Sequence, residues 1–433
     1  MHWTPSSYTS VETSYFKVLS NIDIRTSSES INTHDSLGRI LWNNIISNVD
    51  IPARNSSHMD GFAVRFEDIK WTSRVHPVTL RVARQTRYRS MLSASLHKQE
   101  ASRISTGSYL PPNADTVIPI EYTELDHRNR SVNIYSSFTK GSFVSHAGNE
   151  IKKKALLLRK GHVLRCQDLA LISMLGISYV KVFRKPRVTI IPTGNELTEN
   201  FGDIKKGRVL NTNSRIISKL IEASGGLSLD LGITQDDICE LQRKIMLALP
   251  QSDIIITTGG SSAGTQDLVA ESINRLGKPG VVVHGIKLDR GRVTGLAVLK
   301  RKPIIILPGP VQGTVNGFIV FVLPILRSML GLTSTKNEVI VGKLVHDWYA
   351  REKFQNFLKI LYVKIWKSRF GDIHAMPITG ETSNITVLTR TNGYVMVPEK
   401  LTFMKRGQQI KISLLPGLSF SSDNLIDFPY GSR

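Results

Sequence analysis

The sequence predicts a multidomain protein in which an α/β domain is combined with β-rich domains. The chain has 433 residues, more than one hydrophobic core ordinarily serves. Residues 186–331 alternate apolar strand-like runs with helical segments, which predicts a mostly parallel sheet. Residues 54–140 and 335–418 contain short strand-like runs broken by Pro, Gly and Asn, a pattern typical of small β domains.

Composition narrows the class of protein. Hydrophobic residues make up 41% and charged residues 21% of the chain, which are ordinary values for a globular protein. The longest apolar stretch, residues 317–326, is too short for a membrane span and contains Pro324, so we expect a buried helix and no membrane association. The polar N-terminus lacks the features of a secretion signal, and Cys166 and Cys239 form no CxxC motif. These features favour a cytoplasmic protein without a thiolate metal site.

The formal net charge is +21 and the pI about 10.0, so the protein attracts anions. The candidate partners are nucleic acid, anionic lipid and phosphate-bearing small molecules, and the alternative is a basic surface with no specific partner. The sequence has no zinc finger, no aromatic RNA-binding strand motif and no heptad-linked basic region. We therefore favour small anionic ligands over specific nucleic-acid recognition.

In the first 185 residues we expect helices at both ends of a β-rich segment. Two helices are expected in residues 1–50, and the second, at 33–47, would carry one apolar face. That face consists of Leu37, Ile40, Leu41 and Ile45. Further elements are expected as strands at 78–82, 115–120 and 178–183 and a helix at 168–175. We expect residues 1–53 and 141–185 to form one mixed helical domain, with residues 54–140 inserted as a β-rich domain.

The remaining chain divides into an α/β domain, a second β domain and a tail. In the α/β domain, residues 186–331, we expect strands at 188–191, 227–233, 253–257, 281–284 and 303–307 and helices at 213–224, 239–249, 266–276 and 313–330. In residues 335–418 the Asn392-Gly393 pair predicts a hairpin turn between strands at 384–388 and 394–397, with a third strand at 408–414. The tail, residues 419–433, is polar.

A glycine- and serine-rich loop lies within residues 253–267, DIIITTGGSSAGTQD. A buried strand leads into it and a helix follows, so exposed backbone N–H groups and the helix dipole would favour an anion. The residues that would donate are Gly259, Gly260, Ser261, Ser262 and Gly264. Asp267, in the first helical turn, could hold a metal or a ligand hydroxyl. The alternative is a tight turn, with Asp267 as a favourable charge at a helix start.

Two further strand ends carry candidate residues. The strand at 188–191 runs into Glu196, and the strand at 303–307 runs into Pro308 and Gly309. If the strands are parallel, these loops and the glycine-rich loop open at one edge of the sheet. Glu196 could there coordinate Mg²⁺ or polarise water, or it could simply cap a helix.

The order of motifs along the chain resembles that of the molybdopterin molybdenumtransferase family, which includes the C-terminal domain of gephyrin. The resemblance runs from about Leu37 to Leu415. The motifs are SLGRIL (36–41), MDGFAV (59–64), RISTG (103–107), PPNADTVIPIE (111–121), GNEI (148–151), PTGNEL (192–197), GRVLNTNS (207–214), GGSSAGTQD (259–267), ILPG (306–309) and SNITVLTRTNGYVMVP (383–398).

The resemblance implies an elongated, dimeric protein of four domains. These would include an α/β domain of the molybdopterin-binding type, an inserted β-rich domain and a C-terminal β-barrel domain. The active cleft would lie between the α/β domain of one subunit and the inserted domain of the other. The implied reaction inserts molybdenum or tungsten from molybdate into adenylylated molybdopterin, depends on Mg²⁺ and releases AMP. Molybdopterin adenylyltransferase and cofactor-accepting enzymes are candidate protein partners.

The resemblance also implies roles for individual residues. The implied catalytic residues are Asp60, Glu196 and Asp236. The implied substrate-binding residues are Thr106, Gly259, Gly260, Ser262, Gly264, Asp267, Lys287, Arg292, Pro308 and Gly309. Glu150 and Glu196 are the implied metal ligands.

Several positions depart from the family pattern. Asn55, Asn195 and Asn211 stand where aspartate is usual, and Glu150 also replaces an aspartate. The other departures are Lys154 for a glycine, Asp289 and Arg292 at the two basic positions of a (K/R)PGKP motif, and PVQ after LPG. Loss of carboxylates weakens Mg²⁺ binding, and Asp289 is expected to repel molybdate, an effect that Lys287 and Arg292 could offset. The alternative function is therefore a catalytically weakened paralogue that binds molybdopterin or a protein partner. A weaker alternative is a nucleic-acid-binding protein.

Overall fold

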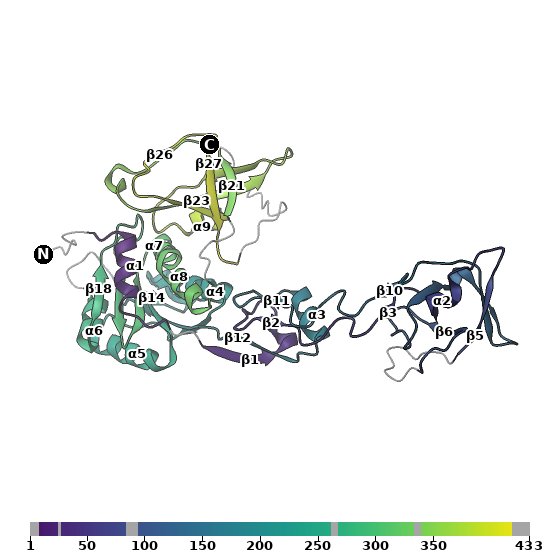
Figure 1. Cartoon of the computed structure of the whole chain (residues 1–433). Helices are drawn as coiled ribbons and strands as arrows, with labels where there is room; N and C mark the ends of the chain where they lie inside the picture. Colours follow the sequence, from purple (N-terminus) through teal and green to yellow (C-terminus); the bar gives the residue numbers. More distant parts are fainter. Residues whose placement is uncertain (1–7, 25–26, 84–93, 261–266, 333–338, 418–433) are drawn as a thin grey trace. The chain divides into compact units, whose positions relative to one another are not determined.

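The computed structural model describes the chain except for residues 1–7, 25–26, 84–93, 261–266, 333–338 and 418–433. The chain folds into two compact units (Figure 1). The larger unit comprises residues 1–29 and 182–433, and the smaller unit comprises residues 30–181. Strands β1 (Ser28–Asn32) and β12 (Tyr179–Phe183) span the two junctions between them.

A six-stranded sheet forms the centre of the larger unit, in the order β16-β13-β17-β20-β19-β18. The strands are β13 (Arg187–Thr193), β16 (Leu227–Asp230), β17 (Ile254–Gly259), β18 (Gly280–His284), β19 (Gly295–Leu299) and β20 (Lys302–Leu307). The first four strands in that order run parallel, and the last two are antiparallel to their neighbours. The prediction of a mostly parallel sheet is confirmed, although β19 was not predicted.

Helices cover both faces of this sheet (Figure 1). They are α1 (Val11–Leu19), α4 (Asn213–Ala223), α5 (Ile238–Gln251), α6 (Leu268–Leu276), α7 (Val311–Gly317) and α8 (Leu323–Met329). α5 and α6 pack together on one face, and α1, α4, α7 and α8 lie over the other. This arrangement follows from the topology, because a connection between parallel strands must cross a face of the sheet.

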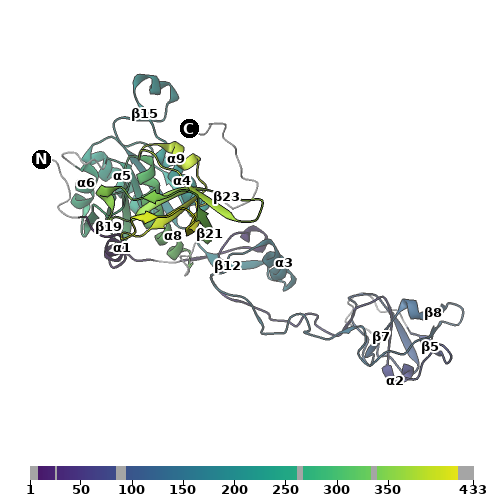
Figure 2. The ribbon, with the colours of Figure 1, turned by 90° about the horizontal axis from the view of Figure 1, so that it is seen from above.

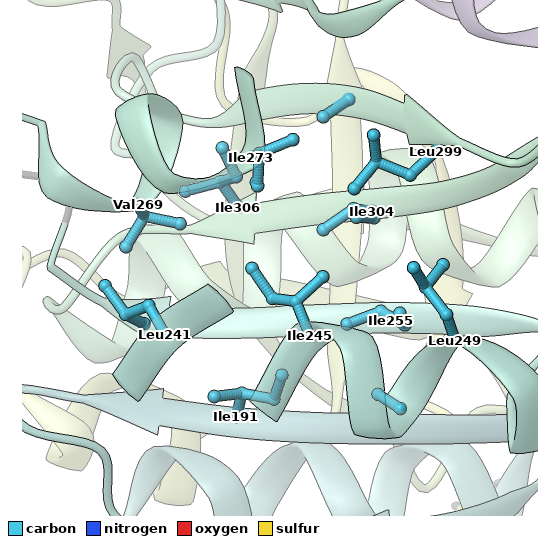
Figure 3. Close-up of a cluster of buried hydrophobic side chains, with 12 residues drawn as sticks. Ile191, Leu241, Ile245, Leu249, Ile255, Val269, Ile273, Leu299, Ile304 and Ile306 are labelled. Atoms are coloured by element: carbon cyan, nitrogen blue, oxygen red, sulfur yellow. The ribbon is translucent and has the colours of Figure 1, made fainter. Parts of the chain in front are cut away.

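The core beneath α5 and α6 is built from branched aliphatic side chains (Figure 3). Ile191, Ile255 and Ile304 come from three adjacent strands and are fully buried. Leu241 and Ile245 of α5, four residues apart, face them from one side of the helix. The neighbouring strand residues Ile254 and Ile256 are also fully buried, as expected for a parallel sheet covered on both faces.

The apolar segment near residue 320 is a buried helix, as predicted. Residues Val311–Met329 form one continuous helical stretch that consists of α7, a π-helical stretch η4 (Phe318–Val322) and α8. This helix is long and apolar enough to cross a membrane, but 83% of its most apolar window is buried inside the protein. It is therefore a core helix of the larger unit.

A short segment projects from the α/β domain next to the end of β13 (Figure 2). It contains β14 (Leu197–Thr198), the 3-10 helix η3 (Phe201–Lys206) and β15 (Val209–Leu210), and the two strands pair in parallel. Asn200 begins η3 by accepting a hydrogen bond from the N–H of Gly202, and Gly207 ends it at φ 82°.

The C-terminal part of the larger unit is a closed five-stranded barrel, in the order β21-β24-β23-β25-β27. Its strands are β21 (Val339–Leu344), β23 (Lys359–Lys367), β24 (Ile373–Pro377), β25 (Gly393–Val397) and β27 (Gln409–Leu414). Smaller elements are β22 (Trp348–Tyr349), η5 (Glu352–Phe354), α9 (Ile385–Thr389) and β26 (Phe403–Met404). Val363, Ala375 and Ile412, all fully buried, fill the barrel interior.

The smaller unit contains a second six-stranded sheet, in the order β7-β4-β6-β5-β9-β8. Its strands are β4 (Gly61–Val64), β5 (Val78–Val82), β6 (Glu100–Ile104), β7 (Thr116–Pro119), β8 (Thr123–Asp126) and β9 (Ser131–Ile134). The other elements are η1 (Thr33–Ser36), β2 (Ile45–Ile46), β3 (Ser56–Ser57), α2 (Phe66–Ile69), η2 (Ile120–Tyr122), β10 (Val144–Ser145), β11 (Leu156–Leu158) and α3 (Cys166–Met174). The strands predicted at 78–82 and 115–120 and the helix at 168–175 are confirmed within two residues.

The predicted helix at 33–47 is wrong. Only η1 is helical there, because Gly38 adopts φ 71° and ends the turn. Ile40 then forms a bridge with Val163, and β2 pairs with β11. The apolar residues are buried by strand pairing, and Leu37, the first of the expected face, remains 57% exposed.

The predicted hairpin around Asn392-Gly393 is also wrong. Residues expected as its first strand form helix α9, and β25 pairs instead with β23 and β27. The side chain of Asn392 accepts a hydrogen bond from the N–H of Ile365 and donates one to its carbonyl, at 2.7 and 3.0 Å. The side-chain amide of Asn392 therefore makes the hydrogen bonds to β23 that the backbone of a neighbouring strand would make, and Asn392 does not form a tight turn.

We predict that Ile255→Ala lowers the free energy of unfolding by about 2–5 kcal/mol, because it leaves a cavity beneath α5. Ile204→Ala is the control, since Ile204 is 48% exposed and its loss should cost no more than about 0.5 kcal/mol. Urea unfolding followed by circular dichroism measures both. Equal effects of the two substitutions would contradict the packing described above.

Candidate functional site

The loops after β13, β17 and β20 meet in one pocket of the larger unit, with a volume of about 670 Å³. Its lining includes residues from all three strand ends: Gly194, Glu196, Gly259, Gly260, Pro308 and Gly309. The remaining lining residues are Asp236, Leu268, Arg290, Gly291, Arg292, Val293, Pro310, Gly313, Arg351, Phe354 and Thr382. The parallel sheet thus brings together the three segments that the sequence predicts at one edge.

Two glycines of this pocket are required by close backbone approach. Gly259 adopts φ 84°, and a Cβ there would lie 2.3 Å from the carbonyl oxygen of Thr193. Gly260 adopts φ 66°, and its Cβ would meet the side chains of Thr193 and Val269 below 3.0 Å. The loop therefore starts tight against β13. Ser262 and Gly264, also predicted as substrate-binding residues, lie outside the described residues.

Asp267 is engaged at the start of α6. One carboxylate oxygen accepts a hydrogen bond from the N–H of Ala270 at 2.9 Å and caps the helix, and the other lies 2.6 Å from Nε2 of His284. Asp267 is not among the pocket-lining residues. The geometry supports the helix-start alternative, and a contact of Asp267 with a ligand stays a prediction.

Asp236 lines the pocket, and its carboxylate is held beside Asn195. Its N–H donates to Oδ1 of Asn195 at 3.1 Å, and its Oδ2 accepts from the N–H of Asn195 at 3.2 Å. Its Oδ1 is buried and has no hydrogen-bond partner among the described residues. Because a buried carboxylate oxygen without a partner is costly, this atom points to a ligand.

The pairing with Asp236 also explains Asn195, one of the departures from the family pattern. The amide oxygen of Asn195 accepts the Asp236 N–H, as a carboxylate oxygen would. An aspartate at position 195 would add a second negative charge beside Asp236. Asn195 thus preserves the hydrogen bond to Asp236, and the site has one negative charge less than it would have with an aspartate at this position.

A buried lysine anchors the segment that leads to Asp236. The ammonium group of Lys244, on α5, donates to the carbonyls of Leu231, Gly232 and Ile233 at 3.1, 2.8 and 2.8 Å. Burial lowers the pKa of this ammonium group. The three hydrogen bonds fix the turn after β16 and so place Asp236 at the pocket.

Glu196 reaches the same pocket from the end of β13. A Cβ at Gly194, which adopts φ 153°, would lie 2.6 Å from the carboxylate of Glu196, so the glycine leaves that carboxylate its space. Nη1 of Arg208 donates to the carbonyls of Asn195 and Leu197, at 2.7 and 3.1 Å. Arg208 thereby fixes the backbone on both sides of Glu196, and Glu196 and Asp236 form the acidic part of the pocket.

Three arginines form a cationic wall, which we define as Arg290, Arg292 and Arg351. Arg292 and Arg351 lie over the ring of Phe354, at 5.9 and 4.7 Å from its centroid. Sequence reasoning identified Arg292 but not the other two. Arg290 lies between Asp289 and Arg292, the two motif positions considered above, whereas Arg351 is more than 50 residues away and belongs to no sequence motif considered above.

The negative charge of Asp289, which lies next to this cationic wall in the sequence, is paired. Its carboxylate forms an ion pair and hydrogen bond with Arg351 of the barrel region and is 12% exposed. The expected repulsion of anions by Asp289 is therefore offset mainly by Arg351. Lys287, predicted to offset it, is not among the pocket-lining residues.

The loop after β20 joins the α/β domain to the barrel region. The backbone N–H of the fully buried Gln312 donates a hydrogen bond to the carbonyl of Thr382 at 3.1 Å. Its side chain donates to the carbonyls of Glu381 and Asn384. Oγ1 of Thr314 donates to the carbonyl of Pro308 at 2.5 Å. The unusual PVQ sequence thus forms a hydrogen-bonded seam between the two parts.

In the smaller unit the structure brings Asp60 and Thr106 together. Oδ1 of Asp60 accepts hydrogen bonds from the N–H and the hydroxyl of Thr106, at 2.7 and 3.0 Å. These bonds, with a smaller contribution from Arg103, lower the pKa of the exposed Asp60 carboxyl. Gly61 is required beside it, because a Cβ would lie 2.0 Å from the carbonyl oxygen of Ile118.

The other departures also have structural partners. Oδ1 of Asn55 accepts from the N–H of Ala147 at 3.0 Å, as a carboxylate would. The amide of the buried Asn211 donates to Glu199 and Ser214 at 2.6 and 2.7 Å, which an aspartate could not do. Lys154 adopts φ 71°, a conformation that glycine adopts more readily.

Glu150 is exposed in the smaller unit, whereas Glu196 lies in the larger one. In the described part of the chain, no group of three or more His, Cys, Asp or Glu side chains could hold a metal. The pocket itself offers Glu196 and Asp236 as oxygen ligands. The metal-binding role of Glu150 stays a prediction.

We predict that Thr106→Val raises the pKa of Asp60 part of the way towards its usual value of about 3.9, because the hydroxyl donor is lost and the amide donor remains. Carbon NMR of the labelled aspartate carboxyls, followed against pH, measures this shift. Thr106→Ser keeps the hydroxyl and is the control. An identical pKa in the Val and Ser variants would contradict the role of the hydroxyl.

Three family models together match most of the chain. The MoeA N-terminal region (domain I and II) matches residues 9–176, a probable molybdopterin binding domain matches residues 189–328, and the MoeA C-terminal region (domain IV) matches residues 343–415. The pocket described above therefore lies in the segments matched by the second and third models.

Whole-chain relatives agree with these matches. A molybdopterin molybdenumtransferase of Staphylococcus epidermidis is 27% identical over 398 residues, covering 92% of this chain and 93% of that protein. One of Staphylococcus aureus is 29% identical over 383 residues, covering 88% and 89%. The crystal structure of a molybdopterin biosynthesis MoeA protein of Pyrococcus horikoshii superposes with a TM-score of 0.84 at 33% identity, covering 95% of this chain and 100% of that one. The chain therefore belongs to the MoeA family of molybdenum cofactor biosynthesis proteins.

Proposed function

We propose that this protein is a Mg²⁺-dependent molybdopterin molybdenumtransferase, which inserts molybdenum or tungsten from molybdate into adenylylated molybdopterin and releases AMP. One observation carries the proposal. A single pocket holds a glycine-rich strand end, two carboxylates and three arginines, and one buried carboxylate oxygen in it, Oδ1 of Asp236, has no partner among the described residues. Its relatives named above are molybdopterin molybdenumtransferases.

The residues of the pocket suit an anionic substrate with a phosphoanhydride bond. The cationic wall would bind oxyanions, and the backbone N–H groups at Gly259 and Gly260, which line the pocket, would donate to a phosphate. Glu196 and Asp236 supply the hard oxygen ligands that Mg²⁺ prefers, and the unpartnered Oδ1 of Asp236 fits such an ion. Bound there, Mg²⁺ would neutralise charge that develops on the phosphate oxygens as AMP leaves.

The protein is proposed to act as a cytoplasmic homodimer, with Asp60 and Thr106 of one copy completing the pocket of the other. Asp60 suits that role because its carboxylate is exposed and its two hydrogen bonds from Thr106 fix its orientation. Molybdopterin adenylyltransferase, which would supply the substrate, and cofactor-accepting enzymes, which would take the product, are the proposed protein partners.

A catalytically weakened paralogue remains the second candidate function. The observation that favours it is the loss of negative charge at position 195, where an asparagine stands beside Asp236 at the pocket rim. Such a protein would bind the pterin substrate without releasing AMP. The arginines and the glycine-rich strand end, which would serve binding, are present in either case.

We predict that the wild-type protein releases AMP from adenylylated molybdopterin when molybdate and Mg²⁺ are supplied. Glu196→Ala and Asp60→Ala should each lower the rate at least about a hundredfold without lowering the melting temperature. The matched control is Glu271→Ala, which removes an exposed carboxylate on α6 that pairs with Arg275. Substrate binding by the wild type with no AMP release would favour the second candidate, and an unchanged rate in either variant would remove that residue from the site.

We also predict complementation between subunits. A purified mixed dimer with Asp60→Ala in one copy and Glu196→Ala in the other would keep one intact pocket, and it should recover about half of the wild-type activity. Each variant homodimer, prepared in the same way, is the control. Activity in the mixed dimer that stays at the level of the homodimers would contradict a pocket shared between copies.

A further inference from the structure

The backbone at Arg290 adopts a conformation that is unfavourable for an arginine. Its φ is 54°, in the left-handed region, where glycine carries no penalty and other residues are uncommon. Non-glycine residues in this region cluster at functional sites, where surrounding structure enforces the conformation. An arginine at position 290 therefore carries a backbone cost that a glycine would not.

Buried polar contacts enforce this conformation. Nδ2 of the fully buried Asn316 donates to the carbonyls of Asp289 and Arg290, at 3.2 and 3.3 Å. Oδ1 of Asn316 in turn accepts from the hydroxyl of Tyr362 at 2.7 Å. A Cβ at Gly313 would lie 2.9 Å from the Arg290 carbonyl, so the helix packs directly on this backbone. The direction in which the Arg290 side chain leaves the chain is thus fixed.

The guanidinium of Arg290 is oriented but not neutralised. Its Nη1 donates to Oε1 of Gln312 at 2.5 Å, and Gln312 is itself held by the carbonyls of Glu381 and Asn384. A guanidinium has five N–H donors, and the residues described by the structure accept from one of them. Among the described residues no carboxylate forms an ion pair with Arg290: its neighbour Asp289 pairs with Arg351, and the charges of Asp289 and Glu381 act on Arg290 without direct contact.

The charge of Arg290 is also partly removed from water. The side chain is partly buried, and burial together with the positive charge of Arg351 lowers the pKa of its guanidinium. A partly desolvated cation attracts an anion more strongly than an exposed one. Arg290 and the glycine-rich strand end line the same pocket.

We propose that Arg290, oriented by Gln312, is a ligand-binding residue of this pocket that holds a tetrahedral oxyanion through its remaining N–H donors. The proposal rests on the proposed function for the nature of the substrate, which contains a phosphate and is converted with molybdate. Arg290 would bind either the phosphate of the substrate or the molybdate. It is distinct from the residues that the family resemblance implied, none of which is at position 290.

The test uses the full-length protein and titration calorimetry with AMP and with sodium molybdate as separate probes. Arg290→Gly removes the charge and also relieves the backbone, so the melting temperature should not fall. Arg301→Gly is the matched control, because Arg301 also has a positive φ, 62°, is 66% exposed and does not line the pocket. We expect Arg290→Gly to weaken binding of at least one probe about tenfold to a hundredfold, and Arg301→Gly to leave both unchanged.

The two probes separate the sources of the oxyanion. Weaker binding of AMP alone assigns Arg290 to the phosphate, and weaker binding of molybdate alone assigns it to the metal oxyanion. Unchanged binding of both probes, an equal loss in the Arg301→Gly control, or a wild type that binds neither probe would overturn the proposal. The result is independent of turnover: an inactive wild type whose anion binding depends on Arg290 would contradict the proposed function only.

Discussion

The parallel register of β13, β17 and β20 is the constraint on which the candidate site depends. In this register Ile190 pairs with Ile256, and Ile256 pairs with Ile305. Thr193, Gly259 and the end of β20 therefore lie at the same edge of the sheet, and the three loops that follow them begin side by side. The register is held by the burial of branched aliphatic side chains on both faces of the sheet. Packing far from the chemistry thus sets the distances within the pocket.

Polar interactions between the α/β domain and the barrel region position the charged side chains around the pocket. Asp289 of the α/β domain pairs with Arg351 of the barrel region, and Gln312 is bonded to carbonyls of the barrel region. The barrel region therefore contributes to the pocket by supplying a cation and by fixing the seam. Interactions of this kind are stronger than exposed ion pairs because they are partly removed from solvent.

Local patterns predicted the central elements, and they failed where a distant partner decides the conformation. The strands at 188–191 and 303–307 were predictable because continuous branched aliphatic runs bury both faces of a parallel sheet. The conformation of residues 384–397 was not, because α9 packs against α7 and Asn392 forms hydrogen bonds with Ile365 of β23, and neither partner can be read from the local sequence. For the site, the strand ends and Glu196 were predicted from their positions after strands. Arg351 could not be, because its role depends on an ion pair with a residue 62 positions away.

Two lysines of this strongly basic chain are buried, and backbone carbonyls take the place of water around their ammonium groups. Lys244 is held by three backbone carbonyls and Lys359 by four, and these two side chains are 8% and 3% exposed. Both lysines count fully in the formal net charge. The carbonyl dipoles that point at their ammonium groups weaken the electric field of these charges at the protein surface. A formal count of basic residues therefore overstates the field that an approaching anion meets, and that field is better judged from the cations that line the pocket.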